Sequence, residues 1–397
     1  MLRTMYPRRY GNYVLLERLD VGGMSEIDLA RQVVEEANFV RFLVIKRIKT
    51  DRNEDASFVR MFKDEARISA QLHHTNIAQV YDFGREGSEY YLVLEYVPGL
   101  DARRIINMLR DRGDVAPIRI TARIIADVLQ GLHHAHQALD AQGRAMKVVH
   151  RDVNPKNILV GVAGEIKLID FGVAKAIDRL ERTATDHVKG KFGYMAPEQV
   201  SGKTEIDHRV DVFATAVTLH EIVAGFSPFY GMNQVQIIAR LTSGQLPELP
   251  NHPDVRDMKA LRAVHRIALA ANPEDRYPDA DAFRSALITA VGGVATTEEV
   301  AAFVRGLDKG LEGRLRDKMT LYSEISLEDS ITAEEPTVVP EARKDPFESE
   351  TLTETLVPAR QDSRWMLIAG AVLAALGLGS LAMSIVIAMV VLYLYQV

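Results

Sequence analysis

The fold is decided by HRDVNPKN at residues 150–157, together with DFG at residues 170–172. Three of their side chains are candidates for the chemistry, namely the carboxylates of Asp152 and Asp170 and the amide of Asn157. Asn157 lies five residues after Asp152 in one loop, and Asp170 closes the strand-like run 166–169. Hard oxygen atoms of this kind are suitable ligands for Mg²⁺. The two stretches therefore predict a compact polar site at the ends of loops and strands.

Two charged residues upstream add a second part to this pattern. Lys46 ends the apolar strand-like run 42–45, and Glu65 lies in a mostly apolar helical stripe. A carboxylate buried in such a stripe requires a partner, and Lys46 is the expected one. The stripe recurs at helical spacing and consists of Phe58, Phe62, Glu65, Ser69 and Leu72.

In this order, and followed by APE at residues 196–198, the motifs resemble those of protein kinases over residues 10–290. The chain is most similar to bacterial Hanks-type serine/threonine kinases, especially those with Gly-Gly-Met in the glycine-rich loop and one membrane helix. The resemblance implies an α+β bilobal protein kinase fold, with a small β-rich N-lobe and a larger helical C-lobe.

The resemblance also implies the cofactors, ATP and Mg²⁺, and a role for each motif. Asp152 is expected to accept or orient the proton of the substrate hydroxyl. Asn157 and Asp170 are the expected metal ligands. Lys46, paired with Glu65, is expected to hold the α and β phosphates.

The expected nucleotide site begins at DVGGMS, residues 20–25, which resembles a kinase glycine-rich loop with Asp20 and Ser25 in place of its first and third glycines. The backbone of residues 95–97 is expected to hold adenine, and Asp101 to reach the ribose. The predicted nucleotide-binding residues are Leu19, Gly22, Gly23, Ile27, Lys46, Glu95, Val97, Asp101, Asn157 and Asp170.

Two positions depart from the serine/threonine kinase pattern. Asn154 stands where these kinases usually have Lys, and Lys191 stands where they have Thr. We hypothesise that Lys191 replaces the missing cation as a catalytic residue, by meeting the γ-phosphate and Asp152. Lys156 is an alternative cation, and Lys191 could instead contact the peptide substrate.

The segment between the DFG and APE motifs indicates regulation. In similar kinases the Arg before the catalytic Asp, here Arg151, pairs with a phosphate on this segment. Thr183 and Thr185 are the candidate acceptors, and self-phosphorylation in trans follows as a hypothesis. The resemblance further implies two structural supports, namely the ion pair of Glu198 with Arg276 and a buried Asp211.

Composition places the catalytic part in a reducing compartment, because the 397 residues contain no Cys. A capping box at Thr296 and Glu299 predicts a helical extension over residues 296–319. Residues 323–364 follow as a predicted flexible acidic linker, with ten acidic and two basic residues between 323 and 359. The 11 His residues show no metal-binding spacing.

The run 366–394 contains no charged residue and predicts one C-terminal transmembrane helix. Arg360, Arg364 and Trp365 precede it, which predicts a single-pass protein of the cytoplasmic membrane with its kinase domain in the cytoplasm. The N-terminus lacks a secretory signal, and three residues follow Leu394, so no external sensor domain is expected. Small residues four apart, such as Gly370 and Ala374, permit a homodimer.

We therefore expect a membrane-anchored ATP-dependent serine/threonine protein kinase that acts on protein hydroxyls in signalling, with no nucleic-acid partner. The alternative is a catalytically weak pseudokinase that serves as a membrane-tethered scaffold, which the departures at Asp20, Ser25, Asn154 and Lys191 motivate. A kinase of small molecules fits poorly with the complete segment between the DFG and APE motifs.

Overall fold

The structure, a computed structural model, describes residues 6–22, 25–32, 40–48, 56–171, 192–201 and 206–325. The chain divides into two compact units, residues 1–339 and 340–397, and all described residues belong to the first. The predicted transmembrane helix at 366–394 lies outside the described residues. Within the described ranges, no helix is both long and apolar enough to cross a membrane.

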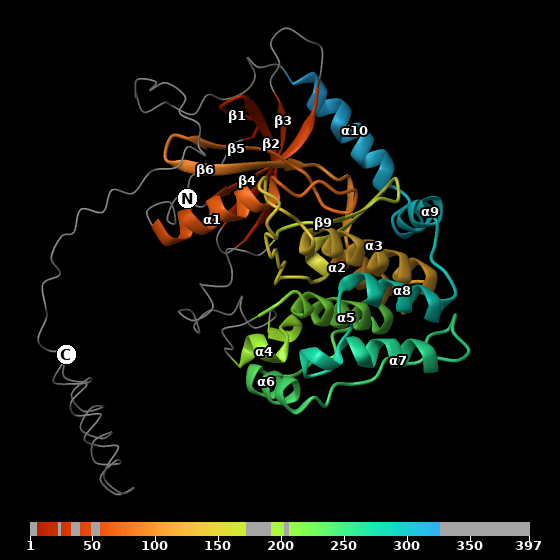
Figure 1. Cartoon of the computed structure of the whole chain (residues 1–397). Coiled ribbons are helices and arrows are strands. Elements are labelled where there is room, and N and C mark those ends of the chain that lie inside the picture. The colour runs from red at the N-terminus through yellow and green to blue at the C-terminus, as the bar shows by residue number, and fades with distance from the viewer. Residues whose placement is uncertain are drawn as a thin grey trace, which may run out of the picture. The chain divides into compact units, whose positions relative to one another are not determined.

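The N-lobe is an antiparallel sheet with the strand order β1-β2-β3-β4-β6-β5. Helix α1 (Ala56–Ser69) lies beside it (Figure 1). Phe58 and Phe62 of α1 pack against Leu92, and the predicted stripe is buried throughout, although its last member, Leu72, follows the end of the helix. The strands are β1 (Arg8–Tyr10), β2 (Tyr13–Val21), β3 (Ser25–Gln32), β4 (Phe42–Ile48), β5 (Val80–Glu86) and β6 (Glu89–Glu95).

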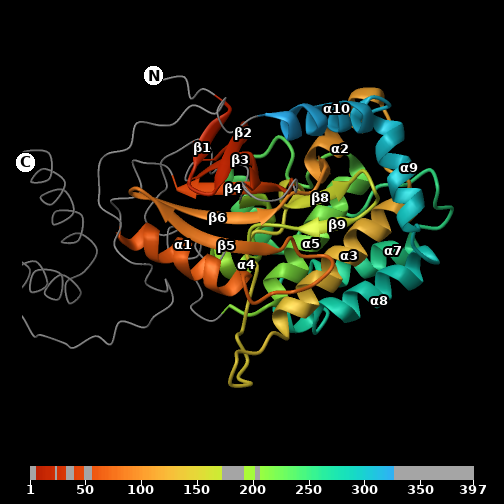
Figure 2. The ribbon, with the colours of Figure 1, turned by 90° about the horizontal axis from the view of Figure 1, so that it is seen from above.

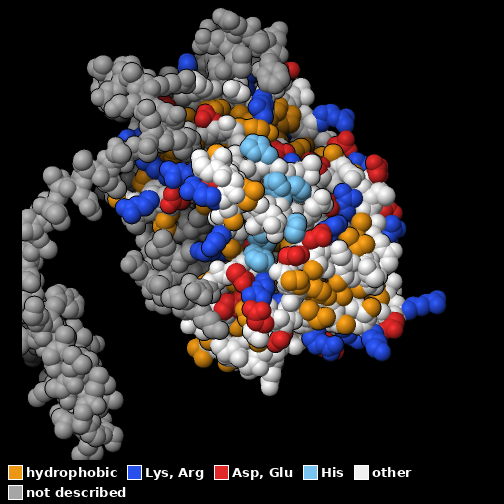
Figure 3. All heavy atoms as spheres, viewed as in Figure 1, with side chains coloured by type: hydrophobic (Ala, Val, Ile, Leu, Met, Phe, Trp, Pro, Cys, Tyr) orange, Lys and Arg blue, Asp and Glu red, His pale blue; other side chains and the backbone are white. Residues whose placement is uncertain are grey.

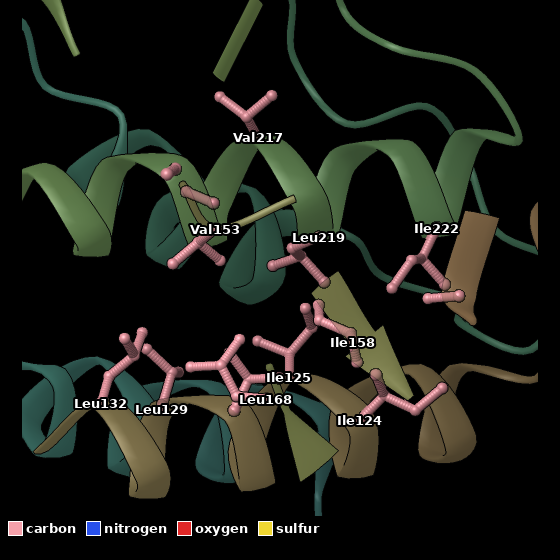
Figure 4. Close-up of a cluster of buried hydrophobic side chains, with 14 of the residues drawn as sticks. Ile124, Ile125, Leu129, Leu132, Val153, Ile158, Leu168, Val217, Leu219 and Ile222 are labelled. Carbon is pink, nitrogen blue, oxygen red and sulfur yellow. The ribbon is translucent and has the colours of Figure 1, made fainter. Parts of the chain in front are cut away.

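The C-lobe is built around helix α5 (Arg209–Ala224), which is buried on every side because most of its residues are apolar or small. Figure 4 shows side chains of α3 (Ile118–His136) facing α5 across the space that Val153, Ile158 and Leu168 share. The other helices of this lobe are α2 (Ala102–Arg112), α4 (Pro197–Val200), α6 (Gln234–Ser243), α7 (Lys259–Ala268) and α8 (Ala280–Val291).

A small antiparallel sheet joins the lobes at the site. Its order is β7 (Gly99–Asp101), β8 (Ile158–Gly161) and β9 (Ile166–Leu168). The strands β7 and β8 approach so closely that a Cβ added at Gly99 would lie 2.2 Å from the carbonyl oxygen of Val160. Because Asn157 precedes β8 and Asp170 follows β9, this sheet brings the two predicted metal ligands to one edge.

The helical extension differs from the prediction of one helix over 296–319. The capping box is present, with Glu299 N donating to Thr296 Oγ1 at 3.2 Å and Thr296 N donating to Glu299 Oε2 at 2.7 Å. Helix α9 (Thr297–Leu307), however, ends before Asp308, and α10 (Leu311–Glu324) begins after it. The carboxylate of Asp308 accepts the N–H of Gly310 at 3.2 Å, and such local bonds compete with helix continuation.

The predicted boundary of the acidic linker at residue 323 is also wrong. Ser323 and Glu324 belong to α10, and Ile325 packs against the N-lobe residues Val14, Leu16 and Leu29. Residues 323–325 are held by contacts with N-lobe residues that are distant in the sequence, and the composition around residue 323 does not reveal such contacts. The rest of the predicted linker lies outside the described residues.

Candidate active site

The centre of the site is Lys46, which lies in the middle of β4 and is buried. Its Nζ lies 2.8 Å from Glu65 Oε1 and 2.8 Å from Asp170 Oδ1. Burial alone would lower the pKa of Lys46, but the charges of Asp170 and Glu65 outweigh it and raise the pKa above its ordinary value. Lys46 is therefore a permanent cation, and the predicted pairing with Glu65 is present in the structure.

The catalytic loop holds Asp152 against Asn157. Asn157 Nδ2 lies 3.0 Å from Asp152 Oδ2 and 2.8 Å from the carbonyl oxygen of Asp152. The same carbonyl accepts a hydrogen bond from Asn154 Nδ2 at 2.8 Å, while Asn154 Oδ1 accepts the N–H of Lys156 at 3.0 Å. Asn154 thus caps the short 3₁₀ helix Pro155–Asn157. Asn154, one of the two residues that depart from the kinase pattern, therefore has a structural task in the loop.

Asp211, at the start of α5, holds the backbone of this loop. Its fully buried carboxylate accepts the N–H groups of His150 and Arg151, both at 2.8 Å, and lies 2.9 Å from His136 Nε2. Arg151 has a φ of 64°, a conformation that is costly for a residue with a side chain. Burial would raise the pKa of Asp211, yet the hydrogen bond from His136 and neighbouring charges hold it below its ordinary value. Asp211 therefore acts as an ionised anchor.

A cavity of about 520 Å³ opens between the lobes at this site. Leu19, Ile27, Lys46, Glu95, Val97, Asp101 and Asp170 of the predicted nucleotide-binding set line it. Gly22 and Asn157 are not among its lining residues, and Gly23 lies outside the described part of the chain. Most of the predicted nucleotide set is therefore brought together around one cavity.

Two of these lining residues also have structural partners. Asp101 Oδ1 accepts the N–H of Arg104 at 2.9 Å and so caps α2, and burial raises the pKa of Asp101. The Glu95 carboxylate lies 2.9 Å from Lys167 Nζ. Their side chains therefore stabilise the wall of the cavity in addition to any contact with a ligand.

The cavity has lining residues that the sequence analysis missed. Leu311, Leu315 and Lys318 of α10 belong to its wall, beside Tyr96 from the expected adenine-binding run 95–97. Spacing of four and three residues along one helical face is the sequence signal that could have identified the first three. Lys156, the alternative cation in the hypothesis above, also lines the cavity, whereas Lys191, Thr183 and Thr185 lie outside the described residues.

The ion pair implied by the APE motif is present below the site. Arg276 donates to both carboxylate oxygens of Glu198, at 2.6 and 2.7 Å, and both side chains are buried. A parallel two-bond pair fixes orientation as well as distance. It joins α4 to the segment before α8 and so supports the end of the segment between the DFG and APE motifs.

Histidine side chains gather on one face of the molecule (Figure 3). His74 stacks on His134 with ring centroids 5.0 Å apart, and His136 lies 5.1 Å from His208. Within the described ranges, no group of three or more His, Asp or Glu residues has the arrangement of a metal site. Asn157 and Asp170 offer the hard oxygen atoms that Mg²⁺ prefers, and the chemistry of this pair fits a cation bound together with phosphate.

Comparison with known proteins gives matches across the same region. A tyrosine-protein kinase, MasK from Myxococcus xanthus, is 41% identical over 281 residues, which are 70% of this chain and 43% of MasK. The serine/threonine-protein kinases PknB from Mycolicibacterium smegmatis and PrkC from Bacillus subtilis are 36% and 31% identical, over 71% and 70% of this chain. The chain spans less than half the length of these relatives, 43% of PknB and 40% of PrkC.

The fold also matches a solved structure. The crystal structure of the Mycobacterium tuberculosis PknI kinase domain aligns with a TM-score of 0.53 and 27% identity, covering 72% of this chain and 98% of that domain. The family model described as "Protein kinase domain" matches residues 13–288. With the bilobal fold, the Lys46–Glu65 pair and the ordered motifs, these matches identify the chain as a member of the protein kinase family, of the type found in bacterial serine/threonine kinases.

Proposed function

We propose that this chain is a serine/threonine protein kinase that transfers the γ-phosphate of ATP to hydroxyl groups of proteins and uses Mg²⁺. The observation that carries the proposal is the position of Lys46, 2.8 Å from both Glu65 and Asp170 at the wall of the inter-lobe cavity. A buried cation held by two carboxylates from different lobes suits the binding of a polyphosphate.

Each residue then has a distinct task. Lys46 binds phosphate oxygens, and Glu65 fixes the direction of its ammonium group. Asp152, oriented by Asn157, accepts or directs the proton of the attacking hydroxyl. Mg²⁺, when bound, neutralises charge on the phosphates. The carboxylate of Asp170 and the side-chain oxygen of Asn157 are the ligand atoms available to hold the ion.

Serine/threonine specificity is the finer part of the proposal. Relatives named serine/threonine-protein kinases support it, as does Pro155 next to Asn154, whereas MasK is named a tyrosine-protein kinase. Phosphoamino-acid analysis of the labelled protein separates the two. Phosphoserine or phosphothreonine is the expected product, and phosphotyrosine alone would contradict the assignment.

The second candidate function is a weakly active membrane scaffold. The acidic Asp20 and the missing third glycine at Ser25 favour it, because a negative charge near phosphate weakens nucleotide binding. Asn154, which also motivates this alternative, has a structural task as the cap of the 3₁₀ helix Pro155–Asn157.

One experiment distinguishes these functions. The full chain, solubilised in mild detergent, is incubated with γ-labelled ATP and Mg²⁺, alone and with a generic basic protein. The Asp170→Asn variant should lose all labelling, and Asp111→Asn, an exposed carboxylate on α2, is the matched control. Labelling that persists in Asp170→Asn comes from a contaminant, and no labelling with no nucleotide binding in the wild type favours the scaffold.

Membrane anchoring through residues 366–394 and phosphorylation of Thr183 or Thr185 are separate parts of the proposal, supported by the sequence. For the first, removal of residues 360–397 should move the protein from the membrane to the soluble fraction. For the second, Thr183→Ala with Thr185→Ala should reduce self-labelling. Unchanged fractionation or unchanged activity would contradict the respective part.

A further inference from the structure

Helix α10 connects the two lobes. Its inward face carries Leu311, Leu315, Met319 and Tyr322, spaced as one helical stripe. Leu311 belongs to the core of the C-lobe and Leu315 packs against that core, whereas Met319 and Tyr322 pack against an N-lobe cluster. Figures 1 and 2 both show α10 running from α9 toward strands β2 and β3. The helix therefore bridges the two lobes, in addition to residues 95–97.

Polar contacts fix the N-lobe end of this bridge. Lys318 Nζ lies 2.7 and 3.0 Å from the two carboxylate oxygens of Glu17, and the hydroxyl of Tyr322 lies 3.2 Å from Glu17 Oε2. The guanidinium of Arg31 donates to the carbonyl oxygens of Ser323, at 3.4 Å, and of Ile325. Contacts with both β2 and β3 hold α10 in one position on the sheet.

The same helix forms part of the wall of the inter-lobe cavity. Leu311, Arg314, Leu315 and Lys318 line it together with Lys46 and Asp170. With α10 in place, the cavity still measures about 520 Å³, within the range of roughly 300–1,000 Å³ that ligand sites occupy. Helix α10 therefore encloses this space and does not fill it.

We infer that α10 is part of the nucleotide-binding site, and that its docking on β2 and β3 increases the affinity for nucleotide. The inference rests on the proposed function. A wall that spans both lobes holds them at the spacing the cavity requires and removes part of the bound ligand from water. Because coupling between two binding events is reciprocal, nucleotide must in turn stabilise the docked helix.

The test uses the full chain in detergent and the affinity for Mg·ADP, measured by titration calorimetry. Met319→Ala with Tyr322→Ala removes two of the apolar docking contacts and the bond from Tyr322 to Glu17, without changing a residue that lines the cavity. The control, Thr320→Ala with Leu321→Ala, truncates the outer face, where Leu321 is 61% exposed. We expect the dissociation constant to rise about fivefold or more in the docking variant, and to stay within about twofold in the control.

Hydrogen exchange of residues 311–324 is the second measurement. Mg·ADP should slow exchange in the wild type, and should slow it less in the docking variant. Arg31→Met provides a milder variant with the same expected direction, should the double variant fail to fold. An unchanged or tighter dissociation constant, with residues 311–324 exchanging freely, would overturn the inference.

Failure of this inference is distinguishable from failure of the proposed function. A wild type that binds no Mg·ADP contradicts the kinase proposal itself. If the wild type binds and Lys46→Met abolishes binding, while the docking variant binds normally, the kinase proposal stands. In that case α10 is a lobe contact that does not contribute to nucleotide affinity.

Discussion

The side-chain amide of Asn157 donates to the carboxylate of Asp152 at 3.0 Å and to the backbone carbonyl oxygen of Asp152 at 2.8 Å. Because both bonds use the amide nitrogen, the side-chain oxygen of Asn157, Oδ1, is the atom that can ligate a cation. One residue thus orients the expected base and contributes to the expected metal site. Neither task alone explains why an amide, with one donor end and one acceptor end, is placed here.

Replacing Asn157 by Ala should therefore affect both tasks. We expect kcat to fall by about 10²-fold or more, since Asp152 loses its orienting partner. The Mg²⁺ concentration needed for half-maximal rate should rise as well. Steady-state kinetics at several Mg²⁺ concentrations checks both. Asn154→Ala is the control variant, because it removes only a helix cap of about 1 kcal/mol and a hydrogen bond to the backbone. An equal loss of kcat in both variants would contradict the orienting role of Asn157.

Asp211→Asn should destabilise the C-lobe and the catalytic loop together. An amide has one acceptor oxygen, so it leaves one of the N–H groups of His150 and Arg151 without its partner inside the fold. We expect the free energy of unfolding to fall by about 3 kcal/mol, measured by denaturant titration. Asp207→Asn, which changes an exposed carboxylate paired with Arg209, should cost less than about 1 kcal/mol. Equal losses of unfolding free energy in the two variants would contradict the role of Asp211 in holding the catalytic loop.

Gly99→Ala should separate β7 from β8. The new Cβ would lie 2.2 Å from the carbonyl oxygen of Val160, and the backbone must shift to relieve the clash. Since Val97 and Asp101 line the cavity on either side, nucleotide affinity should fall along with thermal stability. The control is Gly306→Ala in α9, which meets no atom within 4 Å and should gain roughly 0.5–1 kcal/mol of stability. An unchanged affinity in Gly99→Ala would contradict the prediction.

Acid should destabilise the C-lobe through two buried histidines. Burial lowers the pKa of His220 to about 4, and burial together with the charge of His220 lowers that of His265 to about 3. Below pH 6.5 the unfolded chain therefore binds more protons than the folded chain, and stability falls with pH down to these values. Each histidine contributes about 1.4 kcal/mol per pH unit in this window.

The measurement is denaturant unfolding at pH 6.5 and pH 5, for the wild type and His220→Phe. The variant lacks one titration, so its loss of stability between the two pH values should be smaller by roughly 2 kcal/mol. Phe keeps an aromatic ring beside His265, whose ring centroid lies 5.3 Å from that of His220. Parallel pH dependences in the two proteins would exclude His220 as a source of acid sensitivity.

The parts of the site that sequence predicts are those with a local signature. Glu65 interrupts an apolar helical stripe, and this pattern alone requires a buried partner. The spacing of Asp152, Asn157 and Asp170 is fixed by a loop and two short strands, so their approach follows from the order of the motifs. Buried Asp211 and the Glu198–Arg276 pair were implied by the resemblance, and both are present in the structure.

The parts that sequence did not predict depend on distant contacts or on a single local bond. The second partner of Lys46, Asp170, lies 124 residues away. The task of Asn154 becomes visible only when its two hydrogen bonds are known, and at the break between α9 and α10 the Asp308 carboxylate accepts the N–H of Gly310. Docking of α10 involves Glu17 and Leu29, which lie outside any sequence segment around residue 320 that a local prediction would consider.

The docking of Met319, Tyr322 and Ile325 bears on where the catalytic domain of this chain should be cut for laboratory work. The family match ends at residue 288, but a fragment ending there would leave Val14, Leu16 and Leu29 without three of the side chains that pack against them. Exposed apolar surface of this kind promotes aggregation. A fragment that retains residues through 325 keeps these N-lobe residues covered, so both folding and solubility can be expected of it.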